Sequence, residues 1–153
     1  MPGRGDQTVI TNRRARHDYL ILDVWEAGIV LVGSEVKSIR EAKANLQESY
    51  ARVEDDEVWL YGMHVLPYPY SRVNPDPLRR RKLLLHAREI VELARGTEER
   101  GVTIVPMRVY FKEGRAKVEI GLGRGKRQYD KRQALAARDA KREAERAMKG
   151  DRG

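Results

Sequence analysis

A strand–turn–strand pattern near the end of the chain limits its possible folds more than any other feature. Residues 102–112 and 115–122 contain the β-branched and aromatic residues that are typical of strands, and only Glu113 and Gly114 separate them. A two-residue connection of this kind predicts an antiparallel hairpin. Residues 49–53 and 58–63 predict a second hairpin across the acidic turn 54–57. The chain is therefore expected to build an antiparallel sheet.

Further strands and two helices are expected around these hairpins. The alternating run over 19–25 predicts a strand, residues 26–28 predict a turn or bulge, and the apolar residues 29–32 predict another strand. Ser34 is a candidate N-cap for a helix that stops near Asn45. A second helix is predicted over 86–100 and a short strand over 8–11. Residues 67–77 hold four of the six prolines and predict a loop.

The order of these elements indicates the fold class. Strands, a helix, two strands, a helix and two strands follow one another, without the regular strand–helix alternation of a parallel sheet. The economical architecture is mainly β, an OB-like antiparallel β-barrel with flanking α-helices. With 153 residues, 41% of them hydrophobic, the chain can fill one such core.

The positive charge of the chain is concentrated at its C-terminal end. Residues 124–153 contain 11 Lys and Arg against 5 Asp and Glu, whereas residues 1–123 contain 20 against 18, within a formal net charge of +8. We therefore expect a flexible arm (1–7), an OB-like barrel with its helices (8–123) and a basic tail (124–153). Such tails commonly bind nucleic acid, and a merely solubilising tail is the alternative.

The tail has the composition of a helix that is not stable alone. Residues 126–149 are rich in helix formers, and Ala136, Ala140, Ala144 and Ala147 form one stripe. Because an alanine stripe buries little apolar surface, we expect the tail to be disordered when free and helical when bound to a polyanion. A helix docked on the barrel is the alternative. The glycine-rich residues 121–125 predict a flexible hinge before the tail.

Several classes of enzyme lack their required residues. The chain has no cysteine, which excludes disulfide scaffolds, cysteine-ligated metals and thiol nucleophiles. His17, His64 and His86 stand apart from any metal-ligand spacing, and residues 121–126 match neither the Walker nor the dinucleotide-binding motif. We therefore expect no enzyme activity, no metal and no cofactor. A cytoplasmic protein is expected, because no apolar run is long enough for a membrane span and no secretory signal is found.

Two arginine-rich clusters in the barrel point to RNA. Residues 13–16 precede one predicted strand, residues 79–82 precede another, and tyrosines at 19, 68, 70 and 129 lie in or near basic stretches. Arginine forks onto phosphate, and aromatic rings stack on unpaired bases. Each cluster alone is typical of a solvated surface, but together with the basic tail they favour an RNA-binding protein.

Short motifs along most of the chain also form a recognisable series. They are residues 12–19 (NRRARHDY), 28–31 (GIVL), 35–40 (EVKSIR), 44–45 with 49–50, 81–85 (RKLLL), 121–126 (GLGRGK) and 130–132 (DKR). In this order, over roughly residues 8–149, the chain resembles the small protein B family, the tmRNA-binding proteins of bacterial trans-translation.

The resemblance implies a non-enzymatic adaptor with an OB-like barrel and a tail that orders on the ribosome. Its partners would be the tRNA-like domain of tmRNA, bound by a monomer in a 1:1 complex, and the stalled ribosome. The tail would enter the empty mRNA path beside small-subunit rRNA at the decoding centre, and elongation factor Tu would be met indirectly through aminoacylated tmRNA. A general OB-type RNA-binding protein, such as a ribosome assembly factor, is the alternative.

The resemblance also implies candidate residues on the barrel. Asn12, His17, Glu26, Leu84 and Lys117 match positions linked to tmRNA binding. Glu26 and Leu84 are expected to support the RNA face rather than to touch RNA, since a carboxylate repels phosphate. On grounds of charge, the RNA-binding candidates also include Arg13, Arg14, Arg16, Lys37, Arg81 and Lys82.

The tail supplies the candidates for ribosome binding. Tyr129 matches a position whose ring would stack on a base of the decoding centre. The adjoining motif and the distal tail are matched by Asp130, Lys131, Arg132 and Met148, and phosphate contacts are expected from Arg124, Lys126 and Arg127. Ala140 and Ala147 depart from the family, because they stand where relatives can carry bulkier apolar residues.

Overall fold

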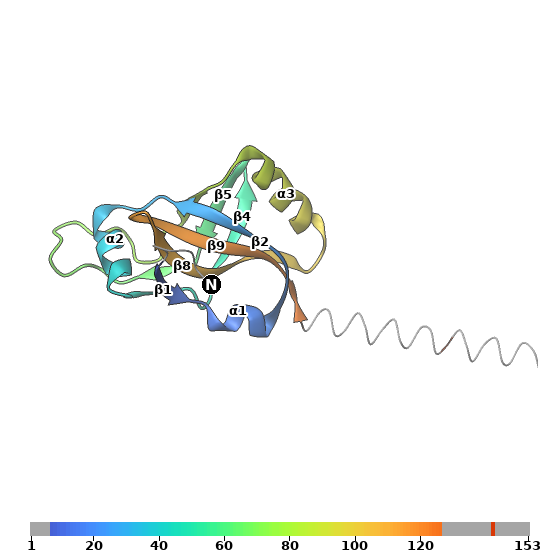
Figure 1. The fold of residues 1–153 in the computed structure, drawn as a ribbon, viewed down its shortest axis with the longest axis horizontal. Helices are drawn as coiled ribbons and strands as arrows, with labels where there is room; N and C mark the ends of the chain where they lie inside the picture. The colour runs from blue at the N-terminus through green and yellow to red at the C-terminus, as the bar shows by residue number, and fades with distance from the viewer. Residues whose placement is uncertain (1–6, 127–141, 143–153) are drawn as a thin grey trace, which may run out of the picture.

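The computed structural model describes residues 7–126 and residue 142, so most of the predicted tail lies outside the described residues. Three helices lie around a curved sheet in the described part (Figure 1). In chain order the elements are β1 (Gln7–Thr11), α1 (Arg13–Asp18), β2 (Tyr19–Ile29), α2 (Gly33–Arg40), β3 (Ala44–Asn45), β4 (Tyr50–Glu54), β5 (Glu57–Tyr61), β6 (His64–Val65), β7 (Arg81–Leu84), α3 (Ala87–Glu98), β8 (Val102–Lys112) and β9 (Arg115–Gly125).

The main sheet closes into a ring of antiparallel strands. Its order is β1-β8-β4-β5-β7-β2-β9. An additional pairing of β8 with β9 closes the strands from β8 to β9 into a ring, and β1 pairs with β8 outside this ring. All the strand pairs are antiparallel. Ring closure leaves fewer unpaired backbone groups at sheet edges. The prediction of a mainly β, antiparallel fold with a few helices is confirmed.

Both predicted hairpins are present in the structure. β8 and β9 are joined at Glu113 and Gly114, which adopt φ angles of 52° and 77°. β4 and β5 are joined at Asp55 and Asp56, with φ angles of 50° and 61°. Two consecutive positive φ angles match the right-handed twist of the flanking strands.

Strand β2 is longer than the sequence pattern predicts. It continues through residues 26–28 to Ile29, so the predicted turn at this position is wrong, and residues 30–32 lie outside the strand. Ala27 is fully buried, and Gly28 pairs with both Leu84 and Lys117. The irregularity that does occur in β2 lies earlier, between Ile21 and Asp23.

The predicted hinge at residues 121–125 is also wrong, because β9 runs through these glycines to Gly125. A Cβ atom on Gly123 would lie 2.9 Å from Cβ of Tyr19, and one on Gly121 would lie 3.0 Å from Cγ2 of Ile21. The glycines therefore make room for Tyr19 and Ile21 of β2, which pack against a small cluster formed by Ala15 of α1 with Val105 and Met107 of β8.

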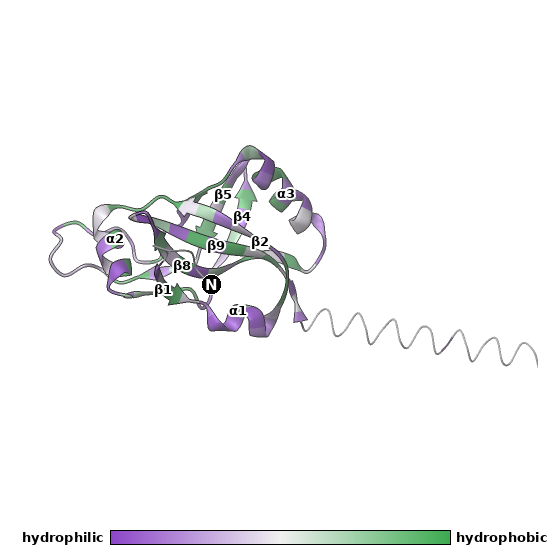
Figure 2. Ribbon diagram, viewed as in Figure 1, coloured by the Kyte–Doolittle hydropathy of each residue, from purple (hydrophilic) through white to green (hydrophobic). Residues whose placement is uncertain are grey.

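The helices differ from the predictions mainly at their ends. Residues 13–18 form a helix that the sequence analysis did not predict, and this helix is largely hydrophilic in Figure 2. α2 begins at Gly33 with Val32 as its N-cap, so the prediction for Ser34 is wrong; Ser34 is buried instead. α3 agrees with the predicted helix over 86–100.

A buried ion pair links α2 to β7 beside the proline-rich loop. Arg81 is 0% exposed, and its Nε lies 2.6 Å from Oε2 of Glu35, which is 2% exposed. Arg81 also donates to the carbonyl oxygens of Met63, Arg79 and Pro77. Burial opposes ionisation of Glu35, but hydrogen bonds from Arg79, the Val32 amide and Arg81 outweigh it and lower the pKa of this carboxyl.

We predict that Glu35→Gln lowers the free energy of unfolding by about 3–5 kcal/mol, because it leaves the buried charge of Arg81 without an anionic partner. Denaturant melts at pH 7 measure this loss. The matched control is Glu57→Gln, which removes the exposed partner of Lys82 and should cost less than about 1 kcal/mol. Equal losses in the two variants would contradict the assigned role of the buried pair.

The same pair predicts a pH dependence of stability. Because folding lowers the pKa of Glu35 below its usual 4.5, the stability it contributes is present above that pH and is lost as the pH falls through the lowered value. The wild type should therefore lose more stability on acidification than Glu35→Gln. Parallel pH profiles of the two proteins would contradict this expectation.

Candidate nucleic-acid interface

Three of the predicted RNA-binding residues meet on the outer surface of the ring. Gly28 pairs with Leu84 of β7 on one side and with Lys117 of β9 on the other. Glu26 precedes Gly28 by two residues, which places it on the same face of β2. Leu84 is 52% exposed. Strands far apart in the chain thus bring Glu26, Leu84 and Lys117 together, and we call them the Gly28 cluster.

A buried tyrosine organises the acid of this cluster. The Tyr110 hydroxyl donates a short hydrogen bond to Oε2 of Glu26, and Nζ of Lys112 lies 3.5 Å from the same oxygen. The hydrogen bond from Tyr110, with a smaller contribution from Lys112, lowers the pKa of Glu26 despite some burial. Burial and the neighbouring carboxylate raise the pKa of Tyr110, which keeps its proton. Glu26 is therefore a fixed anion that holds a lysine in place.

Asn12 attaches α1 to the sheet at an irregularity in β8. The register of β8 against β9 shifts between Pro106 and Arg108. The amide of Asn12 donates to the Met107 carbonyl at 2.8 Å, and its Nδ2 donates to the Pro106 carbonyl at 2.8 Å. Nδ2 also lies 3.3 Å from the Leu46 carbonyl. Since Asn12 is only 7% exposed, it acts as a support for α1 and presents little surface to RNA.

The arginines of α1 are available for ligands. Among the described residues, the ion pairs found do not involve Arg13, Arg14 or Arg16, whose side chains are exposed. His17 is also exposed, and its Nδ1 lies 2.9 Å from Oδ1 of Asp18. This short helix therefore presents unpaired positive charge beside the ring, as the sequence analysis expected for an RNA contact.

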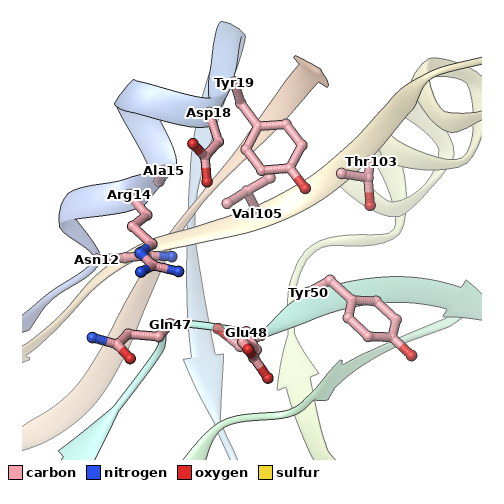
Figure 3. Close-up of a pocket in the computed structure, with 11 residues that line it drawn as sticks. Asn12, Arg14, Ala15, Asp18, Tyr19, Gln47, Glu48, Tyr50, Thr103 and Val105 are labelled. Carbon is pink, nitrogen blue, oxygen red and sulfur yellow. The ribbon is translucent and has the colours of Figure 1, made fainter. Parts of the chain in front are cut away.

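A groove of about 340 Å³ lies along one side of α1 (Figure 3). The Arg14 side chain extends from α1 toward Gln47 and Glu48, and the rings of Tyr19 and Tyr50 stand in the same groove. Guanidinium groups and exposed rings are the groups that contact phosphates and unpaired bases of RNA. The remaining lining residues are Asn12, Ala15, Asp18, Ser49, Thr103 and Val105.

Other predicted site residues lie elsewhere. Arg81 is fully buried and paired with Glu35, so the prediction that it contacts RNA is wrong. Nζ of Lys82 lies 3.0 Å from Glu57 on the outer surface of β5 and β7. Lys37 lies over the ring of Tyr68, 5.4 Å from its centre. A basic run in the sequence does not reveal which of its residues points into the core. The alternation of buried and more exposed residues along β7 does, because it places Arg81 on the same side as the buried Leu83.

The first residues of the predicted tail belong to the described body. Arg124 lies in β9 and pairs with Glu99, and Nζ of Lys126 donates to the backbone carbonyl of Arg16 at 2.7 Å. The chain thus leaves the ring beside α1. The predictions for Arg127, Tyr129, Asp130, Lys131, Arg132 and Met148, together with the stripe that includes Ala140 and Ala147, fall outside the described residues.

Arg108, Tyr110 and Lys112 share the outer face of β8 and are not among the residues predicted from the sequence. Alternation over 102–112 could have placed them on one face. Their connection to Glu26 and Glu119 depends on the register with β2 and β9, which the sequence does not reveal. In the described part of the chain, no group of histidine and acidic residues could hold a metal, and no helix is long and apolar enough to span a membrane.

These features together define a class of protein. A closed antiparallel ring carries arginines without ion pairs on α1, the rings of Tyr19 and Tyr50 in the groove beside them and a lysine-bearing cluster on the outer face of β2 and β9. Phosphate-binding cations together with rings that can stack on bases are typical of RNA-binding barrels.

Comparison with known proteins gives the family. The family model described as SmpB protein matches residues 9–150. Among curated proteins, an SsrA-binding protein of Sulfurihydrogenibium sp. (strain YO3AOP1) is 53% identical over 146 residues, which cover 95% of this chain and 96% of that protein. An SsrA-binding protein of Listeria welshimeri is 52% identical over 150 residues, or 97% of both chains.

A solved structure agrees with these relatives. It is described as "tmRNA-SmpB: a journey to the center of the bacterial ribosome", and it matches with a TM-score of 0.66 and 51% identity, covering 76% of this chain and 82% of that one. The chain therefore belongs to the SmpB family, which confirms the resemblance to small protein B. Members of this family bind RNA and are not enzymes.

We predict that Tyr110→Phe raises the pKa of Glu26, because it removes the hydrogen bond that most strongly favours the carboxylate. NMR titration of the Glu26 carboxyl group measures the change. Tyr61→Phe is the matched control, since the Tyr61 hydroxyl donates to Glu54 instead. An unchanged Glu26 titration in Tyr110→Phe would show that the tyrosine does not organise the Gly28 cluster.

Proposed function

We propose that this chain is a non-enzymatic adaptor that binds the tRNA-like domain of tmRNA and delivers it to stalled bacterial ribosomes for trans-translation. Relatives that match along nearly their whole length are SsrA-binding proteins, and the similar solved structure is a tmRNA–SmpB complex of the ribosome. The observation that carries the proposal is the meeting of Glu26, Leu84 and Lys117 around Gly28. Tyr110, which bonds to Glu26, and Arg108, which packs on Tyr110, lie between this cluster and the arginines of α1.

The OB-like barrel recognises RNA by shape and by local charge. Residues 1–123 carry nearly balanced charge, so general attraction to phosphate is weak over the body. Specific binding then depends on clusters held at fixed positions by the strands, such as Lys117 beside Gly28. A rigid body of this kind can take the place of an anticodon arm beside a tRNA-like RNA. No bond is made or broken in this role.

The basic tail carries the contact with the ribosome. It leaves the ring beside α1 and enters the empty mRNA path, disordered before binding and helical afterwards. Tyr129 stacks on a base of the decoding centre, Asp130, Lys131 and Arg132 follow it, and Met148 lies in the distal part. The protein acts in the cytoplasm as a monomer in a 1:1 complex with tmRNA, and it meets elongation factor Tu through the aminoacylated RNA.

We expect the protein to prefer the tRNA-like domain to an unstructured single strand of equal length, because its cations lie at fixed positions on a folded surface. Competition binding with the two RNAs at one salt concentration measures this preference, since phosphate contacts make affinity depend strongly on salt. Equal affinities would favour the alternative, a general RNA-binding protein such as a ribosome assembly factor.

Truncation after Lys126 should separate the two roles. It keeps β9 and the bond from Lys126 to Arg16, so binding of the tRNA-like domain should change little, whereas tagging on stalled ribosomes should be lost. Binding assays and in vitro tagging assays measure the two effects. Loss of RNA binding on truncation would contradict a division of roles between body and tail.

Tyr129→Ala in the full chain should likewise impair tagging and leave RNA binding intact, as the same two assays measure.

A further inference from the structure

A second pocket, of about 310 Å³, lies on the α1 side of the outer face of β8 and β9. Arg13 and Arg16 are three residues apart on α1, so they lie on the same side of the helix. Arg108 approaches from β8. Three arginines thus line one small pocket, together with one acidic residue, Glu119. The other lining residues are Thr11, Asn12 and Met107.

Arg108 is held in place before any ligand arrives. Its Nε lies 3.2 Å from Oε2 of Glu119, and its Nη1 donates to the Thr8 hydroxyl at 2.8 Å. The guanidinium also lies 4.0 Å from the ring centre of Tyr110. The side chain is 24% exposed, so part of it faces the pocket. A positioned guanidinium loses less conformational entropy on binding than a free one.

The lining of this pocket selects one kind of ligand. The lining contains no aromatic ring, whereas the groove on the Arg14 side of α1, described above, is lined by Tyr19 and Tyr50. A pocket without rings offers no surface for base stacking, but arginine forks match the oxygen atoms of a phosphate. Because Glu119 neutralises one of the three arginines, two positive charges remain, which suits the single charge of a phosphodiester.

We propose that this pocket binds a backbone phosphate of RNA and that Arg108, which no motif singled out, is its anchoring residue. The inference deepens the proposed function and rests on it, since it names a phosphate contact on the surface that recognises the tRNA-like domain. Tyr110 connects the two parts of that surface, because Arg108 packs on its ring and its hydroxyl holds Glu26. RNA positioned at Arg108 therefore continues onto the Gly28 cluster.

The test compares the full chain with Arg108→Ala in binding the tRNA-like domain over a series of salt concentrations. Loss of one phosphate contact should weaken binding about tenfold at low salt and reduce the slope of log affinity against log salt by about 0.7–0.9. Arg108→Lys should keep the slope while losing part of the affinity, because it retains the charge without the fork. A purely structural role would lower affinity without changing the slope.

The matched control is Arg88→Ala, an exposed arginine in the first turn of α3, a helix that Figure 1 shows across the sheet from α1. It should leave both affinity and slope unchanged. Arg108→Gln repeats the measurement with a side chain that can still donate to Glu119 or Thr8, in case melting shows that the alanine variant is destabilised. An unchanged slope in Arg108→Gln, or an equal change in Arg88→Ala, would overturn the proposal.

Two further measurements distinguish a phosphate of the RNA backbone from free phosphate, and failure of this proposal from failure of the proposed function. Millimolar inorganic phosphate at constant ionic strength should not displace the RNA, and displacement would identify a site for the free anion instead. The slopes are measured on the tRNA-like domain and on the unstructured strand. If the wild type shows no preference between these RNAs, the proposed function fails, while a slope change on either RNA still supports the phosphate pocket.

Discussion

Closure of the sheet at β8 is the constraint on which the rest of the structure depends. β8 pairs with β1, β4 and β9, so this one strand joins the N-terminal strand, the central hairpin and the last strand of the ring. At the irregularity of β8 over residues 106–108, the carbonyl groups of Pro106 and Met107 accept hydrogen bonds from Asn12. These bonds attach α1 to the sheet at that point. The position of the α1 arginines is thus a consequence of how the ring closes.

The same closure explains how a nearly neutral body can present a nucleic-acid surface. Acids and bases alternate over the outer face of β2, β8 and β9, and many of them are paired, as Glu26 is with Lys112 and Glu119 is with Arg108. These pairs position cations more than they add net charge. Exposed pairs contribute little to stability, so their placement reflects the requirements of the surface more than those of the fold.

Local patterns predicted the parts of the fold that local interactions decide. The two-residue connection at Glu113 and Gly114 correctly predicted the β8–β9 hairpin, and the apolar spacing over 86–100 correctly predicted α3. The errors came where tertiary contacts override local preference. Residues 26–28 resemble a turn but pair with two strands, and the glycines of 121–125 resemble a hinge but accommodate Tyr19 and Ile21. The arginine-rich residues 13–18 form a helix because Ala15 packs against β8.

The sequence by itself determined the antiparallel class, the separation of a balanced body from a basic tail, and the family to which the chain belongs. These follow from residue types and short spacings, which need no knowledge of distant contacts. Only the tertiary structure decided that Arg81 is a core cation paired with Glu35, and that Arg108 and Tyr110 belong to the surface shared by α1 and the Gly28 cluster. The physical reason is register: which residue faces the core, and which residue it meets, depends on strand pairing between segments up to about a hundred residues apart.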